Sequence, residues 1–130
     1  MQAYPLDPDR LYAGGFSQGA AMSAALALTT PERVAGSLIL SGYLPLNAEL
    51  PLKPEEAAGR PVFEAHGVFD EMIPITWARQ TRRYLQETPV DLTYREYPIG
   101  HWISPEELAD ASAWFSRVLD APEEPATVEG

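Results

Sequence analysis

The stretch Gly15-Phe16-Ser17-Gln18-Gly19 joins a short apolar run to a helix-forming segment, and this order decides the fold. The run before it, residues 10–14, predicts a strand. The alanine-rich segment after it, from Gln18 to about Leu28, predicts a helix that packs closely against a sheet. Glycines two residues on either side of Ser17 permit the sharp strand-turn-helix connection called a nucleophile elbow. We interpret Ser17 as a nucleophile at the end of the strand; the alternative is a glycine-rich turn in which Ser17 only caps the helix.

Outward from this elbow, strands and helices alternate along the chain. We expect strands at 35–41, 61–66 and 91–97, a proline-rich loop at 44–58, and helices at 75–87 and 105–119. Ser104, Pro105 and Glu107 form a capping box that opens the last helix. The alternation predicts an α/β fold with a mostly parallel sheet of about four strands and flanking helices. The buried helix positions that we predict are Ile75, Ala78, Tyr84, Leu85, Leu108, Ala111, Phe115, Val118 and Leu119.

The composition is that of a folded protein of at most one domain. Among the 130 residues 45% are hydrophobic and 22% are charged. We expect the folded part to span residues 1–119, followed by a disordered acidic tail at 120–130 that contains two prolines.

Several partner classes are disfavoured by charge and composition. The formal net charge is −10, which repels nucleic-acid phosphates and anionic lipids. Lys53 is the single lysine, so a phosphate-binding lysine motif cannot be built, and the absence of cysteine rules out disulfides and thiolate chemistry. We find neither a secretion signal nor an apolar run near the roughly 20 residues of a membrane span. We expect a cytoplasmic protein that uses no nucleic acid and does not span a membrane.

A serine nucleophile needs a base, and the chain offers two histidines, His66 and His101. His101 lies in the loop after the last predicted strand, at the edge of a parallel sheet where such groups gather. Because the base follows the acid in this type of fold, His101 is favoured. We interpret His66 as a hydrogen-bonded residue that shapes a turn.

The acid that orients the base should follow the third predicted strand. Asp70 is the candidate there, Glu71 is its rival, and a carboxylate on a surface turn is the alternative for either. The backbone N–H of Gln18, at the start of the helix, is placed to stabilise an oxyanion.

Four segments together resemble the phospholipase/carboxylesterase family of α/β-hydrolases, which includes acyl-protein thioesterases. They are residues 14–20, 40–45, 66–74 and 97–103, in the family's order. The resemblance implies Ser17 as nucleophile, Asp70 as acid and His101 as base, with an ester or acyl thioester substrate and no metal or cofactor. It also suggests acyl-pocket walls, for which simple loop packing is the alternative: Leu44, Ile73 and Trp102.

Relative to that family, the sequence resembles only the C-terminal portion of the domain. We therefore expect a partial α/β-hydrolase fold without the N-terminal strands and without the His-Gly loop that supplies a second oxyanion donor. Such a loss costs about 10²- to 10³-fold in rate. It also leaves the strand before Ser17 at an edge of the sheet, where we expect homodimerisation or other edge association.

Three functions remain open at this point. The favoured one is a serine hydrolase that forms an acyl-Ser17 intermediate. The alternatives are a catalytically inert fragment or interaction module that retains the same residues, and another hydrolase activity such as lactone or peptide cleavage.

Overall fold

The apolar runs of the sequence form the strands of a single parallel sheet. The computed structural model describes residues 11–46 and 48–120. The strands are β1 (Leu11–Phe16), β2 (Val34–Leu40), β3 (Pro61–Gly67) and β4 (Asp91–Tyr97). The helices are α1 (Gln18–Thr29), α2 (Ile75–Gln86) and α3 (Pro105–Asp120), and a short 3-10 helix, η1 (Pro54–Ala57), lies in the proline-rich loop.

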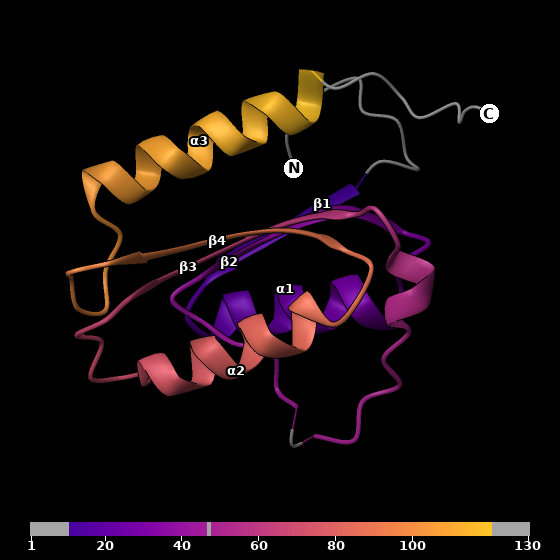
Figure 1. Cartoon of the computed structure of the whole chain (residues 1–130), viewed down its shortest axis with the longest axis horizontal. Helices are drawn as coiled ribbons and strands as arrows, with labels where there is room; N and C mark the ends of the chain where they lie inside the picture. Colours follow the sequence, from indigo (N-terminus) through magenta and orange to yellow (C-terminus); the bar gives the residue numbers. More distant parts are fainter. Residues whose placement is uncertain (1–10, 47, 121–130) are drawn as a thin grey trace.

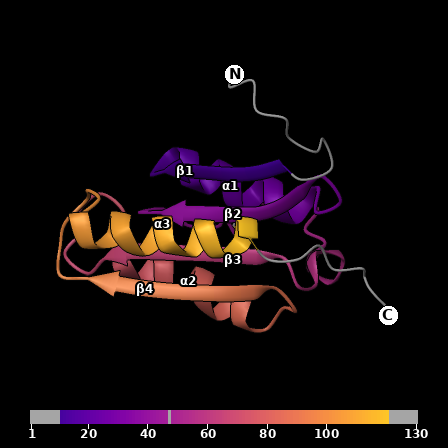
Figure 2. The same cartoon turned by 90° about the horizontal axis from the view of Figure 1, so that it is seen from above.

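Sheet order follows chain order, β1-β2-β3-β4, and all three pairings are parallel. Figure 2 shows the strands pointing the same way. Every loop that leaves the C-terminal end of a strand therefore emerges at the same edge of the sheet. The predicted α/β class and the sheet of four strands are confirmed.

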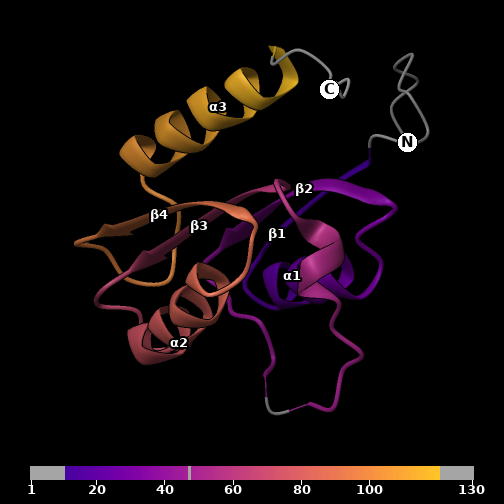
Figure 3. The same ribbon diagram turned by 45° about the vertical axis from the view of Figure 1, so that its right-hand side comes forward.

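The helices form one layer on each side of the sheet. Helices α1 and α2 cover one face and α3 covers the other (Figures 1 and 3). β3 contributes to both cores because alternate residues of a strand point to opposite faces: Val62 packs with α1 and α2, whereas Phe63 packs with Trp114 of α3. Such two-sided burial is typical of a parallel sheet.

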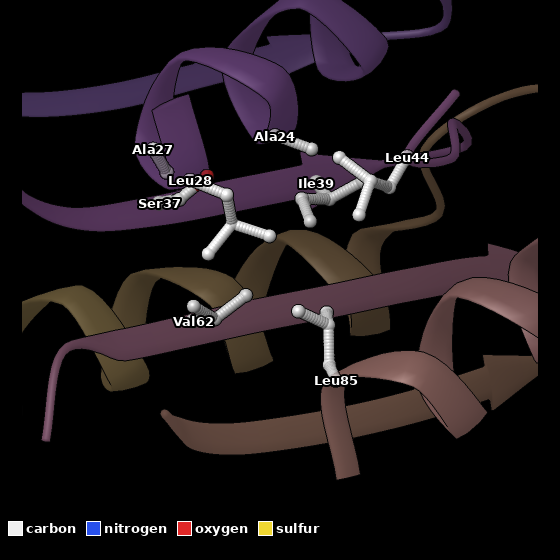
Figure 4. A pocket seen from close by; sticks show the side chains of 8 residues that line it. All are labelled: Ala24, Ala27, Leu28, Ser37, Ile39, Leu44, Val62 and Leu85. Atoms are coloured by element: carbon white, nitrogen blue, oxygen red, sulfur yellow. The ribbon is translucent and has the colours of Figure 1, made fainter. Parts of the chain in front are cut away.

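The core on the α1 and α2 side is closely packed. It leaves a void of about 10 Å³, at the lower limit for one water molecule, between residues that are all apolar except Ser37 (Figure 4). This void lies inside the core and has the size of a packing defect rather than of a ligand site. Its lining residues are Ala24, Ala27, Leu28, Ser37, Ile39, Leu44, Val62 and Leu85.

β1 extends further than the sequence predicted. We expected glycine to end the strand at residue 14, but the ladder continues through Gly15 and Phe16, which pair with Ile39 and Leu40. At Gly15 a side chain would collide with the backbone of Gly19. Gly15 is therefore needed for the strand to reach the turn, and Gly14 does not end the strand.

The buried stripe of α3 is rotated from the predicted one toward Glu107 and Trp114, while Ala111, Phe115 and Val118 pack into the core as predicted. Leu108 and Leu119 are 58% and 45% exposed, which contradicts the prediction that they are buried. The buried residues are Glu107, Ala111 and Trp114, at the spacing of one helix face.

The predicted capping box is half formed. The side chain of Ser104 accepts the backbone N–H of Glu107 at 3.0 Å, as expected. The Glu107 carboxylate does not return the bond, since both its oxygens are buried without a partner among the described residues. Burial raises the pKa of this carboxyl to about 7.

Helix α2 buries Ala78 and Leu85 as predicted, and it also buries Thr81. Two arginines of this helix contact side chains of β4. Arg79 forms a bidentate salt bridge with Glu96, with Nε–Oε2 and Nη2–Oε1 distances of 2.8 and 2.9 Å. The guanidinium of Arg82 lies 4.9 Å from the centre of the Tyr94 ring.

The remaining predictions fall partly on residues without a described structure. The predicted tail, 120–130, lies outside the described part except for Asp120, which ends α3. Over residues 11–46 and 48–120, β1 and β4 form the sheet edges. No helix within those ranges has the length and apolar character to cross a bilayer.

Candidate active site

Ser17 occupies a strained turn between β1 and α1. Its backbone has φ 63° and ψ −121°, a conformation that costs energy for any residue other than glycine. Hydrogen bonds hold the turn in place: the Ser17 N–H donates to the Leu40 carbonyl at 2.9 Å, and the Ser17 carbonyl accepts the Ala21 N–H at 3.1 Å. The predicted elbow is therefore present, with the Ser17 side chain held at the carboxyl end of β1.

Glycines around the elbow do not share one role. A side chain at Gly15 would collide with the backbone of Gly19, as expected for a close strand-to-helix approach. At Gly19 itself a side chain would meet open space, so our prediction of a steric role for that glycine is wrong. Gly42, which the elbow motif does not include, has the steric role instead: a side chain there would collide with Ala20 and approach the Ser17 carbonyl.

The structure brings Ser17, His101 and Asp70 into one hydrogen-bonded chain. His101 Nε2 lies 3.0 Å from Ser17 Oγ, and His101 Nδ1 lies 2.6 Å from Asp70 Oδ2. Because a carboxylate only accepts, Nδ1 carries the proton and Nε2 is free to accept the Ser17 O–H. The rival acid, Glu71, is exposed, and it is Asp70 that meets His101.

The Asp70 carboxylate is held by several donors at once. Its Oδ1 accepts the backbone N–H groups of Met72 and Ile73, both at 2.8 Å, while Oδ2 accepts from His101. Burial disfavours the charged form, but the Ile73, His101 and Met72 donors outweigh it and hold the pKa of Asp70 below its ordinary value. The group is therefore a fixed negative charge behind His101 at neutral pH.

The loops that carry Asp70 and His101 are joined by backbone bonds. Val68 donates its N–H to the Tyr97 carbonyl at 2.8 Å, and Phe69 donates to the Ile99 carbonyl at 3.0 Å. This approach requires Gly67, where a side chain would collide with the Ile99 and Gly100 carbonyls. The ladder between β3 and β4 thus continues beyond the strands and sets the distance between acid and base.

Gln18 is the first residue of α1, so its backbone N–H has no acceptor within the helix. It lies next to Ser17 at the positive end of the helix dipole. This is the place where an oxyanion formed on a Ser17 adduct would lie.

The predicted wall residues lie in different environments. Leu44 is 3% exposed and belongs to the core, although it also borders a hollow of about 280 Å³ beside Tyr43 and Trp77. Ile73 is half-buried in the acid loop. Trp102, next to His101, is 55% exposed.

Apart from Trp102, an apolar rim made of residues within two positions of Ser17, Asp70 and His101 in the chain was missed in the sequence. The ring of Phe16 lies 4.8 Å from that of His101, centroid to centroid, and Phe16 is itself part of the elbow motif, which was the available signal. We define the rim by its exposed large side chains: Phe16, Phe69, Met72, Trp102 and Ile103.

Ser41 was also missed. It follows β2 with φ 55°, and its buried hydroxyl lacks a partner among the described residues. Serine carries no sequence signal for a positive φ. Within residues 11–46 and 48–120, no group of three or more His, Asp or Glu side chains is arranged so that it could hold a metal ion.

With this geometry established, comparisons with known proteins give one consistent result. The profile of the family described as "Phospholipase/Carboxylesterase" matches residues 1–119. "Probable carboxylesterase SOBER1-like" of Arabidopsis thaliana is 31% identical over 118 residues, covering 89% of this chain and 45% of the relative. "Acyl-protein thioesterase 1" of Mycosarcoma maydis is 32% identical over 127 residues, covering 93% and 53%. The chain therefore spans about half the length of the curated relatives it matches.

Solved structures give the same fold. The crystal structure of Arabidopsis thaliana SOBER1 matches with a TM-score of 0.74 at 30% identity, covering 89% of this chain and 56% of that one. The Bacillus cereus carboxylesterase matches with a TM-score of 0.77 over 87% and 52% of the two chains, and at 22% identity this likeness concerns the fold alone.

Proposed function

We propose, from the premise that this chain belongs to the phospholipase/carboxylesterase family, that its site hydrolyses carboxylic esters or acyl thioesters through an acyl-Ser17 intermediate. The observation that supports this best is the continuous chain Ser17–His101–Asp70, with links of 3.0 and 2.6 Å. It supplies a nucleophile, a base in the correct tautomer and a charge that orients the base.

In the acylation step, His101 Nε2 takes the proton of Ser17 while Oγ attacks the substrate carbonyl carbon. The negative charge on the carbonyl oxygen is stabilised by the Gln18 N–H. The imidazolium then gives its proton to the departing alcohol or thiol as the carbon–oxygen or carbon–sulfur bond breaks. Asp70 stays ionised throughout and stabilises the charged His101.

Deacylation repeats these steps with water as the nucleophile. His101 Nε2 removes a proton from water, the resulting oxygen attacks the acyl carbon, and the proton returns to Ser17 Oγ as the acid product leaves. Each turnover consumes one water and restores the starting protonation states, so no metal or cofactor is required by the mechanism.

The acyl side of the substrate is proposed from the apolar rim. Phe16 packs beside the His101 ring, and Trp102 follows His101 directly in the chain. Apolar side chains at this position favour an apolar acyl group by burial against them, about 25 cal/mol for each Å² removed from water. We assign Trp102 and Ile73 to the walls of the acyl site, and Leu44 to the hollow beside Tyr43 and Trp77.

The direct test is covalent labelling by a fluorophosphonate, which reacts with an activated serine. We expect the full chain to be labelled and Ser17→Ala to remain unlabelled. Ser112→Ala is the matched control because Ser112 is exposed on α3. Equal labelling of wild type and Ser17→Ala would contradict the proposal, and p-nitrophenyl esters of increasing acyl length would rank the acyl preference.

One observation favours a second candidate, association through β1. A hollow of about 410 Å³ runs along β1 and α1, and the α1 residues Met22 and Leu26 beside it are 75% and 50% exposed. An edge strand with apolar neighbours favours pairing with another chain, and we propose a second copy as that partner. Light scattering tests this: Met22→Glu should shift a dimer to monomer, and a monomeric wild type would refute it. That the chain is a catalytically inert fragment, and that it is cytoplasmic, both stay predictions.

A further inference from the structure

His66 lies directly behind the acid of the site, although it does not belong to the Ser17–His101–Asp70 chain. It is the sixth residue of β3 and is fully buried. Its Nε2 lies 2.8 Å from the Ile73 carbonyl oxygen and 3.4 Å from Asp70 Oδ2. The expected turn-shaping hydrogen bond is therefore present, and it lies within reach of the acid.

The partners of His66 determine where its proton is. A carbonyl oxygen can only accept, so Nε2 carries the hydrogen that bonds to Ile73. Burial, the largest influence, lowers the pKa of His66 and keeps the ring neutral. The same nitrogen lies 3.4 Å from Asp70 Oδ2, and the neutral ring places no full positive charge beside that carboxylate.

Ile73 connects this bond to the acid. Its N–H donates to Asp70 Oδ1 at 2.8 Å, and its carbonyl accepts from His66. Ile73 is therefore held through both its backbone N–H and its backbone carbonyl. Displacing its carbonyl would move the N–H that orients Asp70.

We propose that His66 is a positioning residue for the hydrolysis proposed above: it fixes Ile73 and thereby the carboxylate plane of Asp70. The inference rests on that proposed function for its catalytic consequence. The geometric part, that His66 sets the hydrogen bond between Asp70 and His101, stands on the contacts alone.

Buried groups on neighbouring positions fit this tautomer. His66 Nδ1 has no partner among the described residues, and neither does the hydroxyl of Ser41. Ser41 directly follows β2, and its N–H donates to the carbonyl of Ala65, the residue before His66, at 2.9 Å. Its O–H is the kind of donor that a buried Nδ1 lone pair needs.

The first experiment uses the full chain labelled with 15N only in histidine. Because the chain has two histidines, the His101→Asn variant assigns both rings. We expect His66 to be neutral with hydrogen on Nε2, and His101 to carry hydrogen on Nδ1. Hydrogen on Nδ1 of His66, with Nε2 bare, would overturn the proposal because Ile73 would then receive no bond.

The second experiment compares two substitutions at His66. His66→Gln keeps a side-chain N–H at similar reach, whereas His66→Leu removes it. We expect His66→Leu to lower kcat about 10- to 100-fold with KM nearly unchanged, since misplacing a catalytic group costs up to that order. We also expect it to shift the deshielded proton resonance of the His101–Asp70 bond. His66→Gln should restore both.

Tyr97→Phe is the matched control for lost stability. It removes the 2.6 Å bond from the Tyr97 hydroxyl to Asp110 of α3 and keeps the Tyr97 carbonyl that accepts the Val68 N–H. It should keep the resonance and kcat while lowering the thermal midpoint. Should His66→Leu lower only the midpoint, as Tyr97→Phe does, His66 has a merely structural role and the proposal is refuted.

Failure of this inference is distinguishable from failure of the proposed function. If turnover does not depend on Ser17, the function fails, but the resonance of the His101–Asp70 proton still reports on His66. If His66→Leu does not fold, the tautomer and the His66→Gln resonance decide: a resonance unlike wild type in a folded His66→Gln chain contradicts the positioning role.

Discussion

Replacing Asp70 by Asn isolates what the carboxylate does, because the amide has the same shape. The two acceptor atoms of Asp70 have different partners: Oδ1 accepts two backbone N–H groups and Oδ2 accepts from His101. In Asp70→Asn, the amide oxygen takes the two backbone donors and the NH2 group faces His101. The ring must then turn its lone pair to the amide, so Nε2 carries the hydrogen and cannot accept the proton of Ser17.

The size of the effect follows from the cost of restoring the correct tautomer. Turning the amide so that its oxygen faces His101 leaves the N–H groups of Met72 and Ile73 without an acceptor. Each unsatisfied buried donor costs about 1–3 kcal/mol, so the pair costs about 4 kcal/mol. At about 1.36 kcal/mol for each tenfold change, this predicts a loss of about 10³-fold in kcat/KM.

The assay is kcat/KM for a p-nitrophenyl ester, with Glu71→Gln as the control that removes a neighbouring exposed carboxylate. We expect the control to stay within about threefold of wild type, as for a weak surface charge. The reasoning is refuted if Asp70→Asn keeps more than a tenth of wild-type activity, or if Glu71→Gln loses as much as Asp70→Asn does.

Three further predictions concern stability. Gly15→Ala should destabilise the fold by about 1–3 kcal/mol through collision with the Gly19 backbone, whereas Gly19→Ala should be neutral or stabilising by up to about 1 kcal/mol. A lower free energy of urea unfolding for Gly19→Ala than for Gly15→Ala would contradict this. Burial raises the pKa of Glu64 to about 9. The stability that its protonated carboxyl contributes is therefore fully present below the pKa of this group in the unfolded chain, and it falls by up to about 1.4 kcal/mol per pH unit as the pH rises toward 9. Glu64→Gln should therefore gain thermal stability relative to wild type as pH rises from 5 to 9, and a difference that stays constant with pH would contradict this. Trp114→Ala should cost about 3–5 kcal/mol and Leu108→Ala less than about 0.5, and equal unfolding midpoints of the two variants would argue against the rotated α3 stripe.

The arrangement of the site was predictable because parallel topology converts chain order into proximity. Ser17, Asp70 and His101 each follow a predicted strand, and the strands end at one edge of the sheet. The bounds of β4 agree with the sequence pattern and those of α2 differ by one residue. A motif with strong local chemistry, such as the elbow or the Ser104 cap, specifies its own backbone, so local sequence was sufficient there.

Features that depend on the opposite side of a contact could not be predicted in this way. Glu64 and Glu107 are fully buried, and their carboxylate oxygens have no partner in the part of the chain that the structure describes. Nothing in a glutamate's neighbours along the chain indicates that a helix or strand will cover it. The α3 stripe was partly misplaced because Leu108 and Trp114 are both apolar, and the sequence does not show that Trp114 packs against Phe63 of β3. The role of Gly42 likewise comes from Ala20, which lies 22 residues earlier in the chain.

The backbone bonds from Val68 to Tyr97 and from Phe69 to Ile99 join the loop of the acid to the loop of the base. The acid and the base follow β3 and β4, which pair directly, whereas the nucleophile follows β1, which is separated from β3 by β2. The nucleophile reaches the base only through side chains, by the 3.0 Å contact between Ser17 and His101 and the ring contact between Phe16 and His101. Heat or mild denaturant should therefore separate the nucleophile from an intact acid–base pair, so that inactivation precedes unfolding and reverses on cooling.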